Sequence, residues 1–363
     1  MPRWWCLPWS LSRDARRVYT VTEPGQPLAA TGERLSLGDF RTSRGDVLRD
    51  AWLGYRVFGD TAAAARNGWI LVFHALTGSP DVDAWWGPLL GPGAPLDTSR
   101  HAVIAANLPG SCYGSIGPAD TNGTPFPALT PEDMARAHVP LLEHLGVERL
   151  SLVAGGSLGG MVALAWGTVS PVPVDRLVVF AAPAATSAQA IAWNAAQRMA
   201  IEADSRWQGG HFAPGAGPVH GLAAARAIAM ITYRSGIEFD ERFGRASTRN
   251  RARFDVEQYL RRQGEKLVER FDARSYVALM AAMDAHDVGD LAVAGARTRE
   301  RVREVVGVGI DTDILYYPDE VRSWVSAYRG AGVNARYEEI SSPYGHDAFL
   351  IEWDQVGALL RDR

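Results

Sequence analysis

Lysine and cysteine are almost missing from this chain. Lys266 is the single lysine among 363 residues, and the Gly-Glu pair before it is not part of a phosphate-binding loop. P-loop chemistry is therefore excluded, and Schiff-base chemistry would depend on Lys266 alone. Cys6 and Cys112 provide neither a disulfide framework nor a metal-binding C-x-x-C pair. So few cysteines are typical of a reducing compartment, and we expect a cytoplasmic protein.

Long apolar runs, basic blocks and metal-ligand clusters are missing as well. No apolar run approaches the roughly 20 residues that a membrane helix requires. The apolar start, residues 1–9, is interrupted by Pro8 and lacks a small-residue cleavage site, so we interpret it as a tail rather than a signal peptide. A net charge of −4 argues against a nucleic-acid partner. The chain has no His-x-x-x-His pair, and we expect no metal site.

Apolar runs of strand length alternate with helical patterns along much of the chain. This alternation predicts a mostly parallel α/β sheet that is flanked by helices. Residues 53–59 are expected to form an antiparallel edge strand before it, and residues 131–145 a helix. The predicted buried strands are residues 69–73, 102–107, 150–154, 177–181 and 305–310.

The alternation stops after Pro183 and resumes at Val305. The residues between are rich in alanine and arginine and have helical patterns only, which indicates a helical cap inserted into the α/β domain. We therefore predict a poorly ordered tail at 1–34, an α/β core at 35–185 and 301–363, and a helical cap at 186–300.

A G-x-S-x-G motif lies at the end of the predicted strand 150–154. The sequence GGSLGG at 155–160 is followed at once by a helical pattern, and this context predicts a nucleophile elbow with Ser157 at the turn. Glycines on both sides let strand and helix approach each other while the serine adopts a strained backbone conformation. A dinucleotide-binding loop would need G-x-G-x-x-G and a later acidic residue, and neither is present. The motif favours an α/β-hydrolase fold.

A serine nucleophile needs a histidine base, which in turn needs an acid, and in this fold they follow in the order Ser, acid, His. His346 follows the strand-like residues 335–340, where the base is expected. The other later histidines lie in the predicted cap and are more typical of surface or packing residues; they are His211, His220 and His286. The acid follows residues 305–310, where Asp311 and Asp313 compete and Asp319 is a weaker third.

The oxyanion hole needs two backbone N–H groups. One is expected from Leu158, directly after the nucleophile, and the other from the loop after the first buried strand. That loop is HALTG at 74–78, which makes Leu76 the candidate and His74 a structural residue of the turn.

Several motifs resemble those of the homoserine O-acetyltransferase family, over about residues 35–360. The sequence DILYYP at 313–318 is similar to the family's acid motif, D-x-L-[FY]-P-P, which implies that Asp313 is the acid and that Tyr317 replaces a proline. The other motifs are HALTG at 74–78, NLPGSCYGS at 107–115, GGSLGGM at 155–161, FDVEQYL at 254–260, FDARSY at 271–276 and GHDAFL at 345–350.

The resemblance also implies an acceptor site. The family holds its amino-acid acceptor with an arginine and a tyrosine of the cap and an aspartate beside the catalytic histidine, which match Arg226, Tyr233 and Asp347. On a helix, Arg226 and Tyr233 are two turns apart and share a face. An arginine fork suits a carboxylate, and Asp347 suits an ammonium group. Without the resemblance, Arg226 would be interpreted as a solvated surface residue.

The expected function is acetyl transfer from acetyl-CoA to the hydroxyl of L-homoserine through an acyl-Ser157 intermediate, a step of methionine biosynthesis. No cofactor is expected besides the acyl-CoA co-substrate, and the resemblance implies a homodimer paired through the cap. A succinyl donor or a serine acceptor are the alternatives within the family. A serine esterase would use the same triad with water, and a non-catalytic binding protein would be expected to have lost a triad member.

Overall fold

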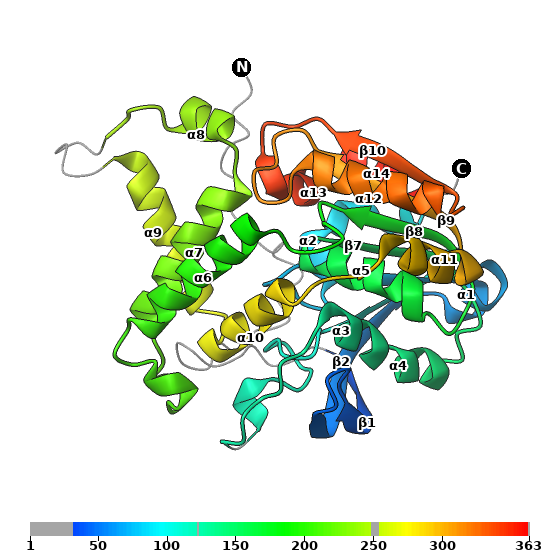
Figure 1. Cartoon of the computed structure of the whole chain (residues 1–363), viewed down its shortest axis with the longest axis horizontal. Coiled ribbons are helices and arrows are strands. Elements are labelled where there is room, and N and C mark those ends of the chain that lie inside the picture. The colour runs from blue at the N-terminus through cyan, green and yellow to red at the C-terminus, as the bar shows by residue number, and fades with distance from the viewer. Residues whose placement is uncertain (1–31, 122, 248–253, 362–363) are drawn as a thin grey trace.

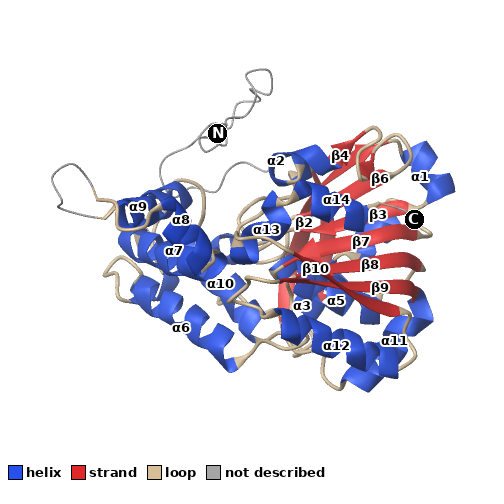
Figure 2. Ribbon diagram, turned by 90° about the horizontal axis from the view of Figure 1, so that it is seen from above, coloured by secondary structure: helices blue, strands red, loops and turns tan. Residues whose placement is uncertain are grey.

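The computed structural model describes residues 32–121, 123–247 and 254–361. These residues form an α/β domain built on one large sheet and a group of helices that lies beside it (Figure 1). Seen from above, the strands fan out across the α/β domain, and the helical group lies beyond one end of them (Figure 2). The predicted α/β-hydrolase architecture with a helical cap is confirmed.

Eight strands form the main sheet in the order β1-β2-β6-β3-β7-β8-β9-β10. β2 runs antiparallel to both of its neighbours, and the strands from β6 to β10 are parallel, so their carboxyl ends meet at one edge. The strands are β1 Glu33–Arg41, β2 Val47–Gly59, β3 Trp69–Phe73, β6 Ala102–Ala106, β7 Leu150–Gly156, β8 Val174–Phe180, β9 Val302–Ile310 and β10 Ala335–Ile340, and a separate parallel pair is β4 Leu90–Gly91 and β5 Leu96–Asp97.

Both faces of the central strands are buried over most of their length, as their largely apolar sequences require. In β3, Leu71 and Phe73 belong to one core, whereas Ile70 and Val72 belong to the other, because successive side chains point to opposite faces. The first core includes residues of α3, α5 and α12, and the second includes residues of α2, α13 and α14. The helices of the α/β domain are α1 Thr61–Asn67, α2 Val82–Trp85, α3 Pro131–Ala137, α4 Val139–His144, α5 Leu158–Val169, α11 Leu291–Arg301, α12 Pro318–Gly330, α13 Ala348–Ile351 and α14 Trp353–Leu360.

The cap consists of helices that lie between β8 and β9 in the chain (Figure 1). α7 packs against both α6 and α9, and α10 packs against α6 and against the 3-10 turn Pro118–Asp120 of the α/β domain. The cap therefore touches a loop of the sheet domain as well as its own helices. Its helices are α6 Ala188–Glu202, α7 Val219–Tyr233, α8 Gly236–Arg242, α9 Asp255–Val268 and α10 Ala273–Asp284.

Three local predictions were wrong. Residues 53–59 do not form an edge strand, because β1 pairs along the outer side of β2. Residues 131–145 form two helices, α3 and α4, since Pro140 has no N–H to continue the hydrogen-bond ladder across the break at His138. The segment of α11 was placed in the cap, but α11 packs against α5 and α12 of the α/β domain.

The predicted N-terminal tail lies mostly outside the described residues. Its last positions, Glu33 and Arg34, belong to β1 and not to a tail. In the part of the chain that the structure describes, none of the helices has the length and apolar character needed to cross a bilayer.

Candidate active site

Ser157 lies at the sharp turn between β7 and α5. Its backbone has φ 57° and ψ −125°, a strained conformation for a residue with a side chain. The turn closes only because the flanking positions are glycines: a Cβ at Gly155 would collide with the carbonyl of Gly159, and one at Gly159 would collide with the carbonyl of Phe73. The predicted strand–turn–helix context is thus present, and the serine stands at the N-terminus of α5.

His346 and Asp313 form a buried pair at the same edge of the sheet. Nδ1 of His346 lies 2.7 Å from Oδ2 of Asp313, and each residue exposes 2% of its surface. The other oxygen of Asp313 accepts from the backbone N–H of Leu315 at 2.8 Å and of Tyr316 at 3.1 Å, which fixes the carboxylate. Nδ1 therefore carries the hydrogen toward Asp313, and Nε2 is left as the basic atom.

The structure separates the competing aspartates. Asp311 is exposed and accepts hydrogen bonds from Ser341 and Ser342, while Asp319 is exposed and pairs with Arg322. Neither carboxylate contacts His346. The position of Asp313, further along the loop after β9, is what places its carboxylate against the imidazole.

The surroundings of His346 favour its charged form. Burial by itself lowers the pKa of this imidazole, but the charge and hydrogen bond of Asp313 outweigh burial, and Asp347 adds to them. The pKa of His346 consequently lies above its ordinary value of 6.5. A raised pKa suits a residue that must accept a proton from a serine hydroxyl.

Phe349 packs against both the turn that carries Ser157 and the ring of His346. The Phe349 ring packs directly on Gly156, beside Ser157, and its centroid lies 5.7 Å from that of His346. Nε2 of His346 is buried and has no hydrogen-bond partner among the described residues. The hydrogen bond between a catalytic serine and its histidine is often long in unliganded enzymes and tightens when substrate binds.

The two predicted oxyanion donors are both at the carboxyl edge of the sheet. Leu158 is the first residue of α5, so its N–H has no acceptor within the helix. Leu76 lies in the loop after β3, where the carbonyl of Ala75 accepts from Nδ1 of His74 at 2.8 Å and from the N–H of Gly78 at 2.9 Å. Because the C=O of one peptide unit points opposite to its N–H, these bonds also set the direction of the Leu76 N–H.

His74 is a structural residue of this loop, as predicted. Its Nε2 accepts from the backbone N–H of Leu108 at 2.9 Å, so the hydrogen must be on Nδ1. Burial lowers the pKa of His74 to about 4, which keeps the ring neutral near physiological pH. The cap histidines also lie apart from the triad: His211 and His220 are exposed, and Nε2 of His286 bonds the carbonyl of Pro183.

The cap places Arg226 and Tyr233 above the base. Both lie on α7, the Arg226 guanidinium carbon is 5.4 Å from the centroid of the Tyr233 ring, and that ring is 5.8 Å from the ring of His346. Arg226 makes no ion pair with a carboxylate of the described residues. A guanidinium that pairs with no carboxylate and lies against a tyrosine next to the buried base is suited to bind a carboxylate of a substrate.

Asp347 lies in the same part of the candidate site, but its carboxylate is already paired with an arginine. Its Oδ2 lies 3.2 Å from Nε of Arg234, the residue after α7, and Arg234 also pairs with Glu238. The sequence analysis missed Arg234, although its position next to Tyr233 could have pointed to it. It also missed Arg270, which donates to the oxyanion loop from the cap.

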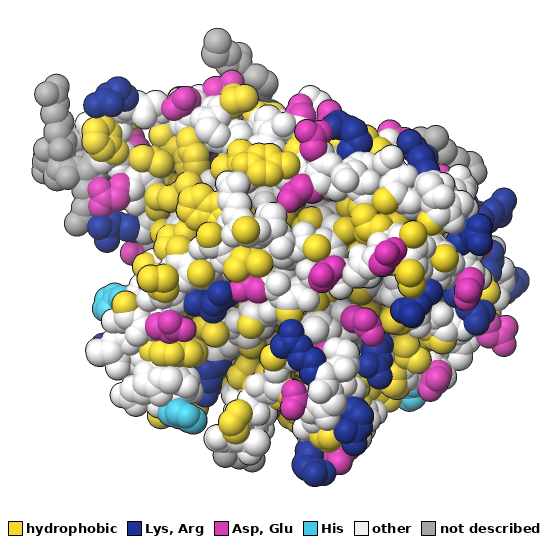
Figure 3. Space-filling model, in the orientation of Figure 1, with side chains coloured by type: hydrophobic (Ala, Val, Ile, Leu, Met, Phe, Trp, Pro, Cys, Tyr) yellow, Lys and Arg dark blue, Asp and Glu magenta, His cyan; other side chains and the backbone are white. Residues whose placement is uncertain are grey.

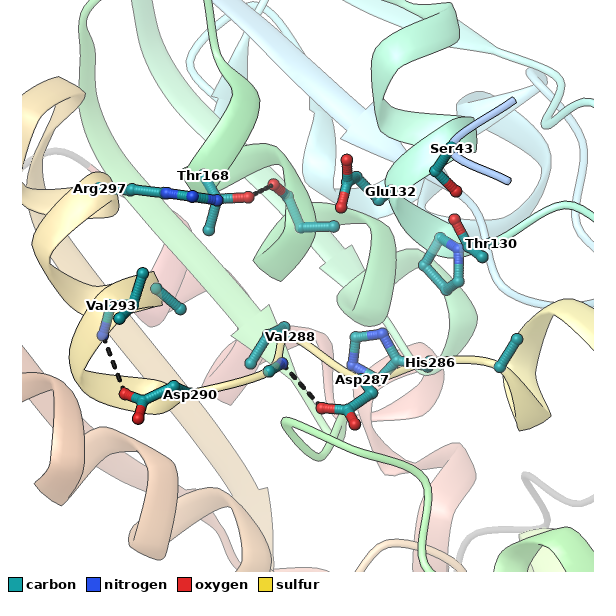
Figure 4. Close-up of a pocket in the computed structure, with 15 residues that line it drawn as sticks. Ser43, Thr130, Glu132, Thr168, His286, Asp287, Val288, Asp290, Val293 and Arg297 are labelled. Atoms are coloured by element: carbon teal, nitrogen blue, oxygen red, sulfur yellow. Dashed lines mark hydrogen bonds between the residues drawn. The ribbon is translucent and has the colours of Figure 1, made fainter. Parts of the chain in front are cut away.

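A cavity of about 330 Å³ is lined by residues other than Ser157, Asp313 and His346 (Figure 4). It is formed by the start of α3, the end of α5 and the link between α10 and α11. Two of its three acidic residues, Asp287 and Asp290, already accept hydrogen bonds from backbone N–H groups of their own turns, at 2.7 and 3.1 Å. This cavity contains none of the predicted catalytic residues. Among the described residues, no group of histidine, cysteine and acidic side chains is arranged to hold a metal ion.

Comparison with known proteins agrees with this geometry. The profile of the alpha/beta hydrolase fold family matches residues 68–352. A homoserine O-acetyltransferase of Moorella thermoacetica is 42% identical over 348 residues, which cover 87% of this chain and 91% of that protein.

Solved structures are similar over most of the chain. The homoserine O-acetyltransferase of Staphylococcus aureus has a TM-score of 0.74 at 28% identity, covering 91% of this chain and 94% of that one. Esterase E22 has a TM-score of 0.81 and covers 91% of this chain and 98% of its own, but at 21% identity this likeness shows the fold alone. The chain is therefore an α/β-hydrolase-fold protein that belongs to the homoserine O-acetyltransferase family.

Proposed function

We propose that this protein transfers the acetyl group of acetyl-CoA to the hydroxyl of L-homoserine through an acyl-Ser157 intermediate. The observation that carries the proposal is the position of α7, where Tyr233 lies near the ring of His346 in its buried pair with Asp313 and Arg226 lies against Tyr233. A hydrolase of simple esters needs the triad but not a carboxylate-binding arginine. A transferase that must seat an amino acid over its base needs both.

In the first half-reaction, Ser157 Oγ attacks the thioester carbonyl while its proton passes to Nε2 of His346. The oxyanion that forms is stabilised by the N–H groups of Leu76 and Leu158. Collapse of the tetrahedral intermediate breaks the C–S bond, and the departing thiolate takes the proton back from His346. Coenzyme A leaves as the thiol, and Ser157 carries the acetyl ester.

In the second half-reaction the acceptor replaces coenzyme A. Its carboxylate binds Arg226 with help from Tyr233, and its ammonium group lies against Asp347, whose other neighbour is Arg234. The acceptor hydroxyl gives its proton to His346 and attacks the acyl carbonyl. When the new ester forms, Ser157 leaves with the proton from His346, and the enzyme returns to its starting state.

Burial of the triad favours transfer over hydrolysis. Ser157 exposes 5% of its surface and His346 exposes 2%. Water therefore has little access to the acyl ester, and an acceptor held by the cap has the advantage of orientation.

We also propose a cytoplasmic homodimer that pairs through the cap. Exposed apolar side chains occur on three of its helices, and Figure 3 shows hydrophobic side chains gathered over this part of the molecule. They include Ile191 and Met199 on α6, Ile231 on α7 and Ile237 on α8. A cytoplasmic location is supported by the scarcity of cysteine, since Cys112 is a buried free thiol.

The test is coenzyme A release from acetyl-CoA and from succinyl-CoA, each with L-homoserine, with L-serine and without acceptor. Release from acetyl-CoA that depends on homoserine is the expected result. Preference for succinyl-CoA or for serine would keep the mechanism but contradict the proposed substrates. Equal release without an acceptor would contradict the proposal and indicate a thioester hydrolase or esterase.

A further inference from the structure

Arg270 of the cap reaches the loop that supplies the Leu76 N–H. It lies in the short link between α9 and α10, and its Nη1 donates to the carbonyl of Thr77 at 2.9 Å while Nη2 donates to Oγ1 of Thr77 at 3.2 Å. Nη1 also donates to the hydroxyl of Tyr113 at 2.5 Å. Arg270 and Thr77 are 193 positions apart in the chain, and their contact joins the cap to the α/β domain.

Thr77 belongs to a tight turn whose geometry sets the oxyanion donor. The turn runs from Ala75 to Gly78 and is closed by the hydrogen bond from the Gly78 N–H to the Ala75 carbonyl. That carbonyl shares its peptide unit with the Leu76 N–H, so any change in the turn redirects the donor. His74 holds this turn from the α/β domain, and Arg270 holds it from the cap.

The charged guanidinium of Arg270 donates its hydrogen bonds to these neutral acceptors. Asp272, two positions along the chain, is already paired with Arg274 through Nε and Nη2, at 3.0 and 2.7 Å. No carboxylate of the described residues forms an ion pair with Arg270. Hydrogen bonds from a charged donor are about twice as strong as neutral ones, and a guanidinium offers several in a fixed geometry. Arg270 therefore fixes the position of Thr77 through hydrogen bonds and is not part of a surface salt bridge.

We propose that Arg270 is a positioning residue for acyl transfer: by holding Thr77 it fixes the turn that aims the Leu76 N–H, so the oxyanion hole is complete only with the cap in place. The inference rests on the proposed acyl-Ser157 chemistry. It does not depend on which acyl donor or acceptor the enzyme prefers, because every acylation of Ser157 passes through the same oxyanion.

The experiment measures acylation of Ser157 by p-nitrophenyl acetate, a small ester that needs neither the coenzyme A site nor the acceptor site. The variants are Arg270→Met, which keeps the bulk of the side chain and removes its donors, and Arg270→Lys, which keeps the charge and some donors. The matched control is Arg274→Met, which removes an arginine from the same part of the cap but leaves the oxyanion loop untouched. Thermal unfolding of each variant is recorded alongside.

Arg270→Met should lower kcat for acylation, taken from the rate of the p-nitrophenol burst, by at least about tenfold, toward the 10²-fold that loss of one oxyanion donor costs. KM for the ester should change less than about threefold, because an oxyanion donor acts in the transition state. Arg270→Lys should recover part of the rate, and Arg274→Met should match the parent enzyme. This kcat-selective loss is not expected from a residue that only stabilises the cap.

A folded Arg270→Met variant that acylates at the parent rate would overturn the inference. An equal loss in Arg274→Met would also overturn it, since a general loosening of the cap would then explain the effect. Failure of the proposed function appears elsewhere, as parent enzyme that releases coenzyme A without any dependence on homoserine. The two failures are therefore distinguished by different proteins and different substrates.

Discussion

Asp313 does two things at the scale of a single residue. Its Oδ2 faces Nδ1 of His346, and its Oδ1 is fixed by two backbone N–H groups, so the carboxylate cannot turn away from the imidazole. An amide in its place would present a donor to Nδ1 and favour the wrong tautomer. The acid is therefore needed both for its charge and for its acceptor atoms.

Asp313→Asn should lower kcat for coenzyme A release by about 10⁴-fold, the size of loss that the same change causes in a Ser-His-Asp triad. Asp311→Asn is the matched control. It alters an exposed carboxylate in the same loop, and its rate should stay within about twofold of the parent. Steady-state kinetics with acetyl-CoA and homoserine measures both. Comparable losses in the two variants would contradict the assignment of the acid.

The pH dependence of acylation should report His346. The imidazole must be neutral to accept the serine proton, so the rate rises with pH through the pKa of His346, which lies above 6.5. Asp347 is one of the groups that raise this pKa. Asp347→Asn should therefore move the acid limb to lower pH, by less than about one unit because Arg234 already offsets part of the charge.

The measurement uses p-nitrophenyl acetate, so that any effect of Asp347 on acceptor binding does not enter. Asp354→Asn, which changes an exposed carboxylate on α14, is the control and should leave the limb where it is. A limb that moves to higher pH in Asp347→Asn would contradict this account of the base.

At the scale of elements, the turn between β7 and α5 is built by close approach. The backbone of α5 comes so near to β7 and β3 that the positions of Gly155 and Gly159 have no room for a side chain. Gly330, at the end of α12, is different, because a Cβ there would meet open space. The two kinds of glycine predict opposite effects of the same substitution.

Gly155→Ala should destabilise the protein by about 1–3 kcal/mol or more, since the added methyl forces the backbone apart, and should abolish acylation of Ser157. Gly330→Ala should be neutral or stabilise by up to about 1 kcal/mol, because alanine favours a helix. Denaturant unfolding and the p-nitrophenyl acetate assay test both. A Gly155→Ala enzyme with parent stability and rate would refute the tight packing of the elbow.

Helix α7 carries Arg226 and Tyr233 of the proposed acceptor site on one face. Arg226→Met should raise KM for homoserine by about tenfold to 10²-fold, because a hydrogen bond to a charged group contributes about 1.5–3 kcal/mol. Acylation by p-nitrophenyl acetate should be unchanged, since that step involves no acceptor. Arg261→Met on the exposed side of α9 serves as the control, with parent KM expected. An unchanged KM for homoserine in Arg226→Met would remove the basis for transfer to an amino acid.

For the whole molecule, most of the sheet but only part of the candidate site could be predicted from the sequence. The buried strands were predictable because short, largely apolar runs such as 69–73 and 150–154 are typical of strands that are buried on both faces. β1 was not, since most of its residues are exposed and it carries no apolar run. The composition of α11 is similar to that of the cap helices, so only its packing on α5 and α12 assigns it to the sheet domain.

The candidate site follows the same rule. Ser157, Asp313 and His346 stand in motifs that are local in sequence, and their order is typical of the fold. Arg234 and Arg270 contact Asp347 and Thr77, which are far away in the chain, and no local pattern indicates such pairs. The long-range contacts between the cap and the sheet domain are thus the part of the candidate site that only the structure reveals.

The exposed apolar side chains of the cap predict how copies of the chain associate. Met199 on α6 exposes 66% of its surface and Ile237 on α8 exposes 54%. Met199→Glu with Ile237→Glu should convert the proposed homodimer to a monomer, because charges in an apolar interface lose their hydration. Light scattering across a concentration series measures the mass. A parent protein that is already monomeric, or a double variant that stays dimeric, would contradict pairing through this face.

Both half-reactions of the proposed mechanism pass through acyl-Ser157, and the removal of its acetyl group can be followed by mass spectrometry. The enzyme is mixed with acetyl-CoA alone, then divided between buffer and L-homoserine, and samples are quenched in acid for mass spectrometry. The account predicts one acetyl group, mapped to Ser157, that homoserine removes much faster than buffer does, with O-acetylhomoserine as the product. Absence of acetylation, or an acetyl group on a residue other than Ser157, would contradict the proposed intermediate. Loss of the acetyl group in buffer as fast as with homoserine would also contradict the proposed transfer.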